Sequence, residues 1–237
     1  MTAAATSRPR VPSADAAHAA AAVARLDEIT HRLRRECPWD REQDERTIVP
    51  HTLEEAYELS DAAHRHDDGK LLDELGDVMF QVHFLALLLE ERGAGDLATV
   101  ADHCTAKLIR RHPHVFGSER AENAEQVLRN WDQIKRDEEG REPGIFGDVP
   151  ETLPALLYAR KVQRRASGSP PPVSIDRVRE GLLTLESADG RDEQFDALGA
   201  VLFELVAVAR RMHVDPELAL RATADRFRER VGAESGS

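Results

Sequence analysis

The chain has 237 residues, a length that allows one or two domains. Its 44 acidic residues outnumber its 32 basic ones, and a net charge of −12 argues against a protein that coats the backbone of nucleic acid. Two cysteines, Cys37 and Cys104, exclude a disulfide framework, argue against a cysteine-based zinc site and favour a reducing cytoplasm. No apolar run approaches the roughly 18 residues of a membrane span, so we expect no membrane partner.

Helix-forming residues dominate the chain after residues 1–13, a polar tail with two prolines for which we expect disorder. Strand-like alternation is missing, so the sequence predicts an all-α protein. Pro38 should end the first helix, because a proline disfavours the helical conformation of the residue before it. An irregular stretch is expected to reach His51, and Thr52 begins a capping box, Thr-Leu-Glu-Glu, for the second helix. The expected helices cover residues 14–36, 52–66, 70–92, 97–111, 123–139, 153–167, 174–187, 192–212 and 216–231.

The Gly-Ser-Pro-Pro-Pro run at residues 168–172 is the clearest linker in the sequence. We predict one helical module at residues 14–140 and a connector with one helix at residues 141–172. A second, smaller module is expected at residues 173–232, with a short tail at residues 233–237.

Two pairs of carboxylates at i, i+3 spacing mark the second and third helices. Glu55 and Glu58 form the first pair, and Glu74 and Asp77 form the second. This spacing places both members of a pair on one helix face. At about 100° per residue, both pairs border apolar arcs, whereas Glu54 points towards solvent. A hairpin of the two helices would bring the four carboxylates together, with the third helix burying an apolar stripe at Leu71, Leu75, Val78, Val82, Leu85 and Leu89.

Four neighbouring carboxylates repel one another and lose hydration, so they need bound cations or raised pKa values. We expect no Lys or Arg on the flank of the third helix that carries Glu74 and Asp77. A hard divalent cation is the simplest remedy, and oxygen ligands favour Mg²⁺, Mn²⁺ or Ca²⁺ over zinc or copper. The alternative is a solvated acidic face whose spacing is coincidental.

Lys107, Arg110 and Arg111 form a basic cluster at the end of the expected helix 97–111. Cations there stabilise the helix C-terminus through its macrodipole, but they can also clamp a polyphosphate. Trp131 stands four residues before Lys135, and it can pack in a core or offer its face to a nucleobase beside a charge. A glycine-rich phosphate loop and a Gly-x-Ser-x-Gly turn are both missing, which argues against P-loop and covalent serine chemistry.

Taken together and in order, these motifs resemble the MazG family, the all-α nucleoside triphosphate pyrophosphohydrolases. The resemblance covers about residues 26–167. The family's metal pattern, Glu-Glu-x-x-Glu followed by Glu-x-x-Asp, matches Glu54, Glu55 and Glu58 and then Glu74 and Asp77. The matching segments are residues 37–43, 52–58, 73–81, 107–116 and 131–135.

The resemblance implies a helical bundle of the all-α NTP pyrophosphohydrolase type, assembled as a homodimer. It also implies Mg²⁺-dependent hydrolysis of nucleoside triphosphates to the monophosphate and pyrophosphate, a house-cleaning of the nucleotide pool, with Mn²⁺ as a substitute. The implied metal ligands are Glu55, Glu58, Glu74 and Asp77, and Glu54 or Glu55 would orient or deprotonate the attacking water. The implied substrate contacts are Lys107, Arg110 and Arg111 at the phosphates and Trp131 and Lys135 near the base.

The second module resembles a degenerate copy of the first. Residues 178–184 keep only Glu180 of the first metal motif, and Ala197 and Ala200 replace both acids of the second motif. We therefore expect residues 173–232 to pack or dimerise without catalysing. Two alternatives stay open: an enzyme specialised for one modified or deoxy nucleotide, and a non-catalytic regulatory module that binds nucleotide or metal.

Overall fold

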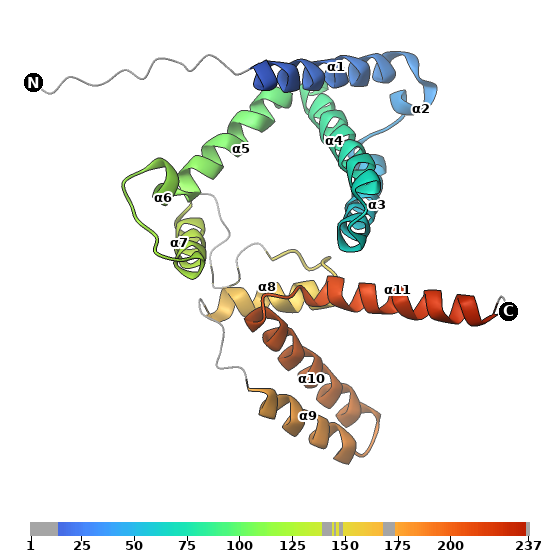
Figure 1. Ribbon diagram of the computed structural model, residues 1–237, viewed down its shortest axis with the longest axis vertical. Helices are drawn as coiled ribbons and strands as arrows, with labels where there is room; N and C mark the ends of the chain where they lie inside the picture. The colour runs from blue at the N-terminus through green and yellow to red at the C-terminus, as the bar shows by residue number, and fades with distance from the viewer. Residues whose placement is uncertain (1–13, 139–143, 145, 147–148, 168–173, 236–237) are drawn as a thin grey trace, which may run out of the picture. The chain divides into compact units, whose positions relative to one another are not determined.

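The computed structural model describes residues 14–138, 144, 146, 149–167 and 174–235 (Figure 1). The described residues form helices and no strands, which confirms the all-α prediction. The expected disordered tail at residues 1–13 and the Pro-rich run at residues 168–172 lie outside them. The chain divides into two compact units, residues 1–105 and 106–237, while the module boundaries expected at residues 140 and 173 stay a prediction.

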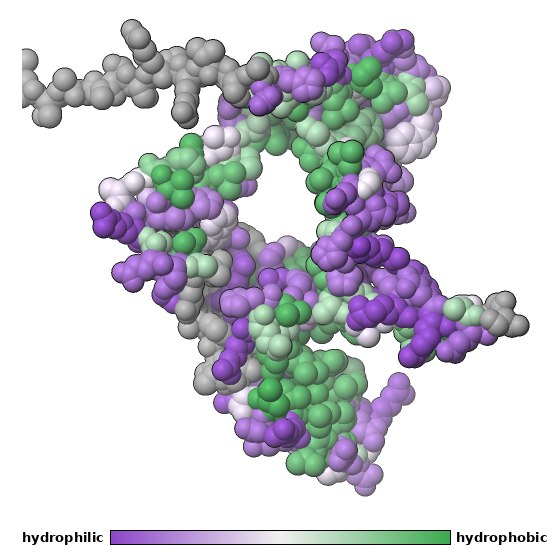
Figure 2. Space-filling view, in the orientation of Figure 1, coloured by the Kyte–Doolittle hydropathy of each residue, from purple (hydrophilic) through white to green (hydrophobic). Residues whose placement is uncertain are grey.

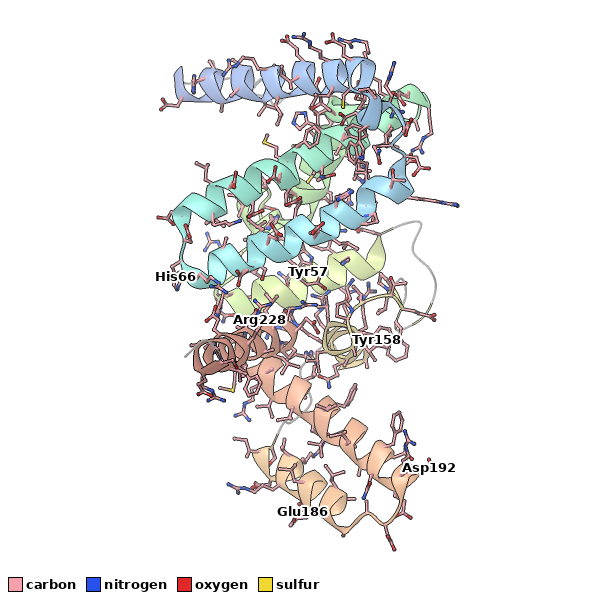
Figure 3. The ribbon with its side chains drawn as sticks, turned by 90° about the vertical axis from the view of Figure 1, so that its right-hand side faces the viewer. Tyr57, His66, Tyr158, Glu186, Asp192 and Arg228 are labelled. Atoms are coloured by element: carbon pink, nitrogen blue, oxygen red, sulfur yellow. The ribbon has the colours of Figure 1, made fainter. Side chains whose placement is uncertain are left out.

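The first unit is built around a helical hairpin. Helices α3 (Glu45–Arg65) and α4 (Asp68–Glu91) run antiparallel and pack against each other. His66 forms the turn between them with a left-handed backbone, φ 56°, and Figure 3 labels it at that end of the hairpin. The unit also contains α1 (Ala14–Glu36), which packs on α4, α2 (Pro38–Arg41), and the start of α5 (Leu97–Arg111).

The start of α3 differs from the expected one. The prediction that residues 37–51 are irregular and that Thr52 caps the helix was wrong. Asp44 caps it instead, because its carboxylate accepts hydrogen bonds from two backbone N–H groups, those of Arg46 and Thr47, and Thr47 Oγ1 accepts one from the Asp44 N–H. This reciprocal capping box begins the helix at Glu45, and Thr52 lies inside it.

Tertiary packing holds these added turns. Ile48 is 1% exposed and packs with Phe84 and Leu88 of α4 in the core of the unit. Burying such a side chain contributes about 1.5–3 kcal/mol, which offsets the hydrogen bond that Pro50 cannot donate inside the helix. The helix therefore continues through a proline that a local pattern would assign to its boundary.

The buried face of α4 also differs from the expected stripe. Leu75 and Val82 are 50% and 41% exposed, so their assignment to the core was wrong. Because α4 packs against both α1 and α3, its buried face includes polar side chains that find partners on those helices. His83, for example, is 2% exposed, and its Nδ1 lies 3.2 Å from Asp27 Oδ1 of α1.

The second unit contains another antiparallel hairpin, formed by α9 (Ile175–Ser187) and α10 (Arg191–Arg211). Figure 3 labels Glu186 and Asp192 at its turn. The two helices approach closely at Gly181, where an added Cβ would lie 2.9 Å from Val201 Cγ2. The remaining elements are the end of α5, α6 (Pro113–Phe116), α7 (Ala124–Asp137), α8 (Ala155–Ser167) and α11 (Pro216–Ser235).

The hydropathy of the helices shows whether any of them could cross a membrane. Among the described residues, no helix combines the length and the apolar character that crossing a bilayer requires.

Candidate active site

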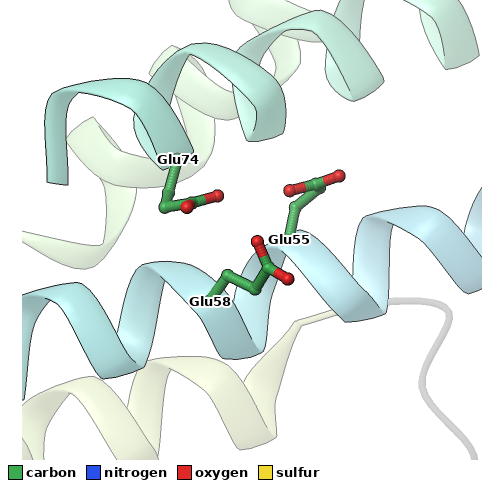
Figure 4. Close-up of side chains that lie close together, drawn as sticks. All are labelled: Glu55, Glu58 and Glu74. Carbon is green, nitrogen blue, oxygen red and sulfur yellow. The ribbon is translucent and has the colours of Figure 1, made fainter. Parts of the chain in front are cut away.

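Three of the predicted metal ligands converge in the α3–α4 hairpin. Glu55 and Glu58 of α3 and Glu74 of α4 each place one carboxylate oxygen within 4.8 Å of the other two (Figure 4). Glu74 is 2% exposed, Glu55 is half-buried and Glu58 is exposed. The antiparallel hairpin thus aligns the i, i+3 pair of α3 with the first carboxylate of the α4 pair.

Asp77, the fourth predicted ligand, is exposed and stands outside that group of three, although its charge acts on the group. The pKa of Glu55 is raised above its ordinary value, first by burial and then by the negative charges of Asp77, Glu58 and Glu74. The negative charges of the cluster therefore repel one another, and a bound cation would relieve that repulsion.

A lysine that the sequence interpretation overlooked lies on the same flank. The expectation of no Lys or Arg beside Glu74 was wrong, because Lys70 Nζ lies 2.8 Å from Glu74 Oε1. This hydrogen bond and the Glu74 charge raise the pKa of Lys70. The i, i+4 spacing from Lys70 to Glu74 is the signal that could have found it. One exposed ammonium compensates only part of the charge of four carboxylates.

The donor set fits a hard divalent ion. Its ligands are carboxylate oxygens on two rigid helices, the type that Mg²⁺ and Mn²⁺ prefer. Gln81, two turns beyond Glu74 on the same face of α4, is 7% exposed, and its buried Oε1 has no hydrogen-bond partner among the described residues. Such an orphaned acceptor requires a polar ligand, for example a water molecule.

The two candidates for the catalytic base differ in their surroundings. Glu54 is exposed, stands outside the carboxylate group, and lies 3.7 Å from His51 Nδ1. Glu55 belongs to the group and carries the raised pKa.

The predicted phosphate-binding residues lie at the end of α5, in the second unit. Arg110 and Arg111 both bind one carboxylate, that of Glu138, at nitrogen–oxygen distances of 2.8 Å and 2.6 Å. These hydrogen bonds, that of Arg111 first, lower the pKa of Glu138 to about 2. Lys107 is half-buried one turn earlier on α5.

Trp131 of α7 lies beside the same arginines. The guanidinium carbon of Arg111 is 5.6 Å from the centroid of the indole ring, within the range of a cation–π contact. The ring of His112 meets the indole edge-on, with centroids 4.8 Å apart. Lys135 follows one turn later on α7 and is half-buried.

Comparison with known proteins assigns the chain to a family. Residues 43–116 match the model described as "MazG nucleotide pyrophosphohydrolase domain". The "Nucleoside triphosphate pyrophosphohydrolase" of Escherichia coli K12 is 38% identical over 222 residues, which span 87% of this chain and 84% of that protein. The "Nucleoside triphosphate pyrophosphohydrolase/pyrophosphatase MazG" of Thermotoga maritima is 37% identical over 200 residues, 82% of this chain and 77% of that protein.

The crystal structure of a mazG-related protein from Thermotoga maritima aligns with 48% of this chain and 98% of its own, at 26% identity and a TM-score of 0.42. The family match at residues 43–116 contains both carboxylate pairs and the basic end of α5. With identity above one third to two named relatives over most of its length, this chain belongs to the MazG family of nucleotide pyrophosphohydrolases.

Proposed function

We propose that this protein hydrolyses nucleoside triphosphates to the nucleoside monophosphate and pyrophosphate, with Mg²⁺ as the natural ion and Mn²⁺ as a substitute. The observation that carries the proposal is the convergence of Glu55, Glu58 and Glu74 from two helices. Named relatives of similar length carry this activity in their names, which supports the same reaction here.

Glu55, Glu58, Glu74 and Asp77 would hold the ion, which when bound polarises the phosphoryl oxygens of the substrate. Glu55 is also the stronger candidate for the base, because it belongs to the carboxylate group and is half-buried, whereas Glu54 is exposed and outside that group. The attacking water would lose that proton as its oxygen bonds to the α-phosphorus. The bond from the α-phosphorus to the bridging oxygen then breaks, and pyrophosphate leaves with the electron pair.

The basic cluster would bind phosphate groups of a nucleoside triphosphate. Arg110 and Arg111 present forked donors suited to phosphate oxygens, and Lys107 adds a point charge. Trp131 would contact the base, with Lys135 nearby.

Incubation with ATP and Mg²⁺ tests the reaction. We expect AMP and pyrophosphate in equal amounts, resolved by ion-exchange chromatography, and no product when EDTA removes the ion. Formation of ADP and phosphate would contradict the proposal. Binding of ATP without turnover would instead support the regulatory-module alternative, which the alanines at positions 197 and 200 of α10 favour. A panel of modified and deoxy nucleotides tests the specialised-enzyme alternative.

We also propose that the protein is a homodimer, assembled through the hairpin that carries the carboxylates. Along α4, Leu72, Leu75, Met79 and Val82 follow the spacing of a helix–helix seam and are between 38% and 75% exposed. Exposed apolar side chains in such a row are typical of an interface. A second apolar face covers the α9–α10 hairpin (Figure 2), where Phe195 and Leu198 are 76% and 47% exposed.

Leu72→Glu is therefore expected to weaken dimerisation by about a hundredfold or more, because it places a charge in an apolar seam. Analytical ultracentrifugation over a concentration series measures the effect. Leu220→Glu on α11, where the leucine is 59% exposed, is the matched control and should leave the assembly intact. An unchanged dimer in Leu72→Glu would exclude α4 as the interface.

A further inference from the structure

Two adjacent arginines at the end of α5 bind one carboxylate, that of Glu138. Arg111 donates from Nε to Glu138 Oε1 at 2.8 Å and from Nη2 to Oε2 at 2.6 Å. Arg110 donates from Nη2 and Nε to the same Oε1, at 2.8 Å and 3.3 Å. Consecutive side chains on a helix diverge by about 100°, so both arginine side chains must bend towards this one carboxylate.

The arginine side chains, not the helix, hold this anion. A helix C-terminus disfavours negative charge, so the two guanidinium groups must outweigh the macrodipole of α5. Arg111 and Glu138 are 13% and 14% exposed, which shields their contact from water. The pKa of Glu138, lowered to about 2, keeps the carboxylate ionised at every working pH. A competing anion must therefore displace a charged group.

The surroundings allow such an exchange. Glu138 follows the last turn of α7 with an extended backbone, φ −67° and ψ 132°, so its side chain can swing away without breaking that helix. Arg111 keeps a second support, because its guanidinium lies over the ring of Trp131. His114 offers a buried Nδ1 without a partner among the described residues, and its ring lies 5.6 Å from that of His112.

We propose that Glu138 is an internal competitor for the anion site of Arg110 and Arg111, and that a phosphate group of the ligand binds there by displacing its carboxylate. The identity of the ligand rests on the proposed function. A terminal phosphate carries more charge than a carboxylate and offers three acceptor oxygens, so it favours the exchange. The competition weakens the binding of pyrophosphate as well as of substrate, and it therefore speeds product release.

Binding of inorganic pyrophosphate to the full-length protein tests the proposal without turnover. Glu138→Gln keeps the shape of the side chain and removes its charge. We expect it to bind pyrophosphate about tenfold more tightly than the wild type in isothermal titration calorimetry. Glu186→Gln on α9 makes the same charge change at an exposed site and should leave the affinity unchanged.

Kinetics supply a second readout. Glu138→Gln should lower the KM for ATP and the inhibition constant of pyrophosphate by similar factors, without raising kcat. A purely structural contact predicts the opposite, since the arginines would lose their orientation and KM would rise. An affinity for pyrophosphate that is unchanged or weaker in a folded Glu138→Gln variant overturns the proposal.

Two further outcomes keep the test decisive. If circular dichroism shows that the Gln variant unfolds, Glu138→Asp replaces it. The shorter side chain keeps the charge but reaches the arginines less well, so pyrophosphate should still bind more tightly, and equal affinity would overturn the proposal. Tighter pyrophosphate binding without ATP turnover would retain Glu138 as a competitor while refuting the proposed enzyme. Turnover of ATP with an unchanged KM in Glu138→Gln would support the proposed enzyme and refute Glu138 as a competitor.

Discussion

Glu74→Gln is expected to lower Mg²⁺-dependent release of pyrophosphate from ATP by about a thousandfold, in line with the loss of a metal ligand or a preorganised charge. Glu74 is the most buried carboxylate of the site and the one contributed by α4 to the group of three. The amide keeps the size of the side chain but removes the charge that a divalent ion requires. Asp77→Asn should lose activity as well, by a smaller factor because Asp77 is exposed.

A coupled pyrophosphate assay at saturating Mg²⁺ measures this loss, and circular dichroism checks the fold. Asp73→Asn is the matched control, since Asp73 precedes Glu74 on α4, is exposed and stands outside the carboxylate group. We expect Asp73→Asn to retain the turnover of the wild type. Turnover of Glu74→Gln within about tenfold of the wild type would remove Glu74 from the metal centre.

Glu55→Gln is expected to have opposite effects on stability with and without metal. In the metal-free protein, the raised pKa of Glu55 reflects burial and the charges of its neighbours, so removing its charge should stabilise the fold. With Mg²⁺ present, the wild type should gain about 2.7 kcal/mol at an ion concentration of a hundred times Kd, because the ion binds only the folded state. Glu55→Gln should lose most of that gain.

The free energy of unfolding should change with pH in a definite direction. A carboxyl group whose pKa is higher in the folded than in the unfolded chain favours folding below its ordinary pKa and loses that contribution as the pH rises through the raised value. The unfolding free energy of the metal-free wild type should therefore fall as the pH rises above the ordinary range of glutamate. Glu55→Gln should flatten this decline, and Mg²⁺ should oppose it.

Thermal unfolding in EDTA and in Mg²⁺, across a pH series, measures these effects. Glu54→Gln is the control, because Glu54 neighbours Glu55 but is exposed and outside the carboxylate group. A melting temperature of Glu55→Gln below that of the wild type in EDTA would show that repulsion does not govern this cluster.

Local patterns in the sequence were sufficient for the all-α class, for most of the longer helices and for the two carboxylate pairs. An i, i+3 spacing is a property of one helix, so it could be recognised before Glu55, Glu58 and Glu74 were known to meet. The helix from Ala14 to Glu36 was likewise anticipated at both ends, since Pro38 stops it locally. The salt bridge of Lys70 with Glu74 was equally local and was overlooked.

Only the tertiary structure decided which side chains are buried and which cations are engaged. Ile48 extends α3 through Pro50 because it packs against Phe84 of α4, a contact between residues far apart in the chain. Leu75 was assigned to the core because it belongs to an apolar arc of its helix. Such an arc does not show which part of it another helix covers. No local spacing indicates that Glu138 binds Arg110 and Arg111, because the contact joins the ends of two different helices, α5 and α7. The periodicity of a sequence shows which residues share one face of a helix. Which faces contact one another depends on how the helices pack in the folded chain.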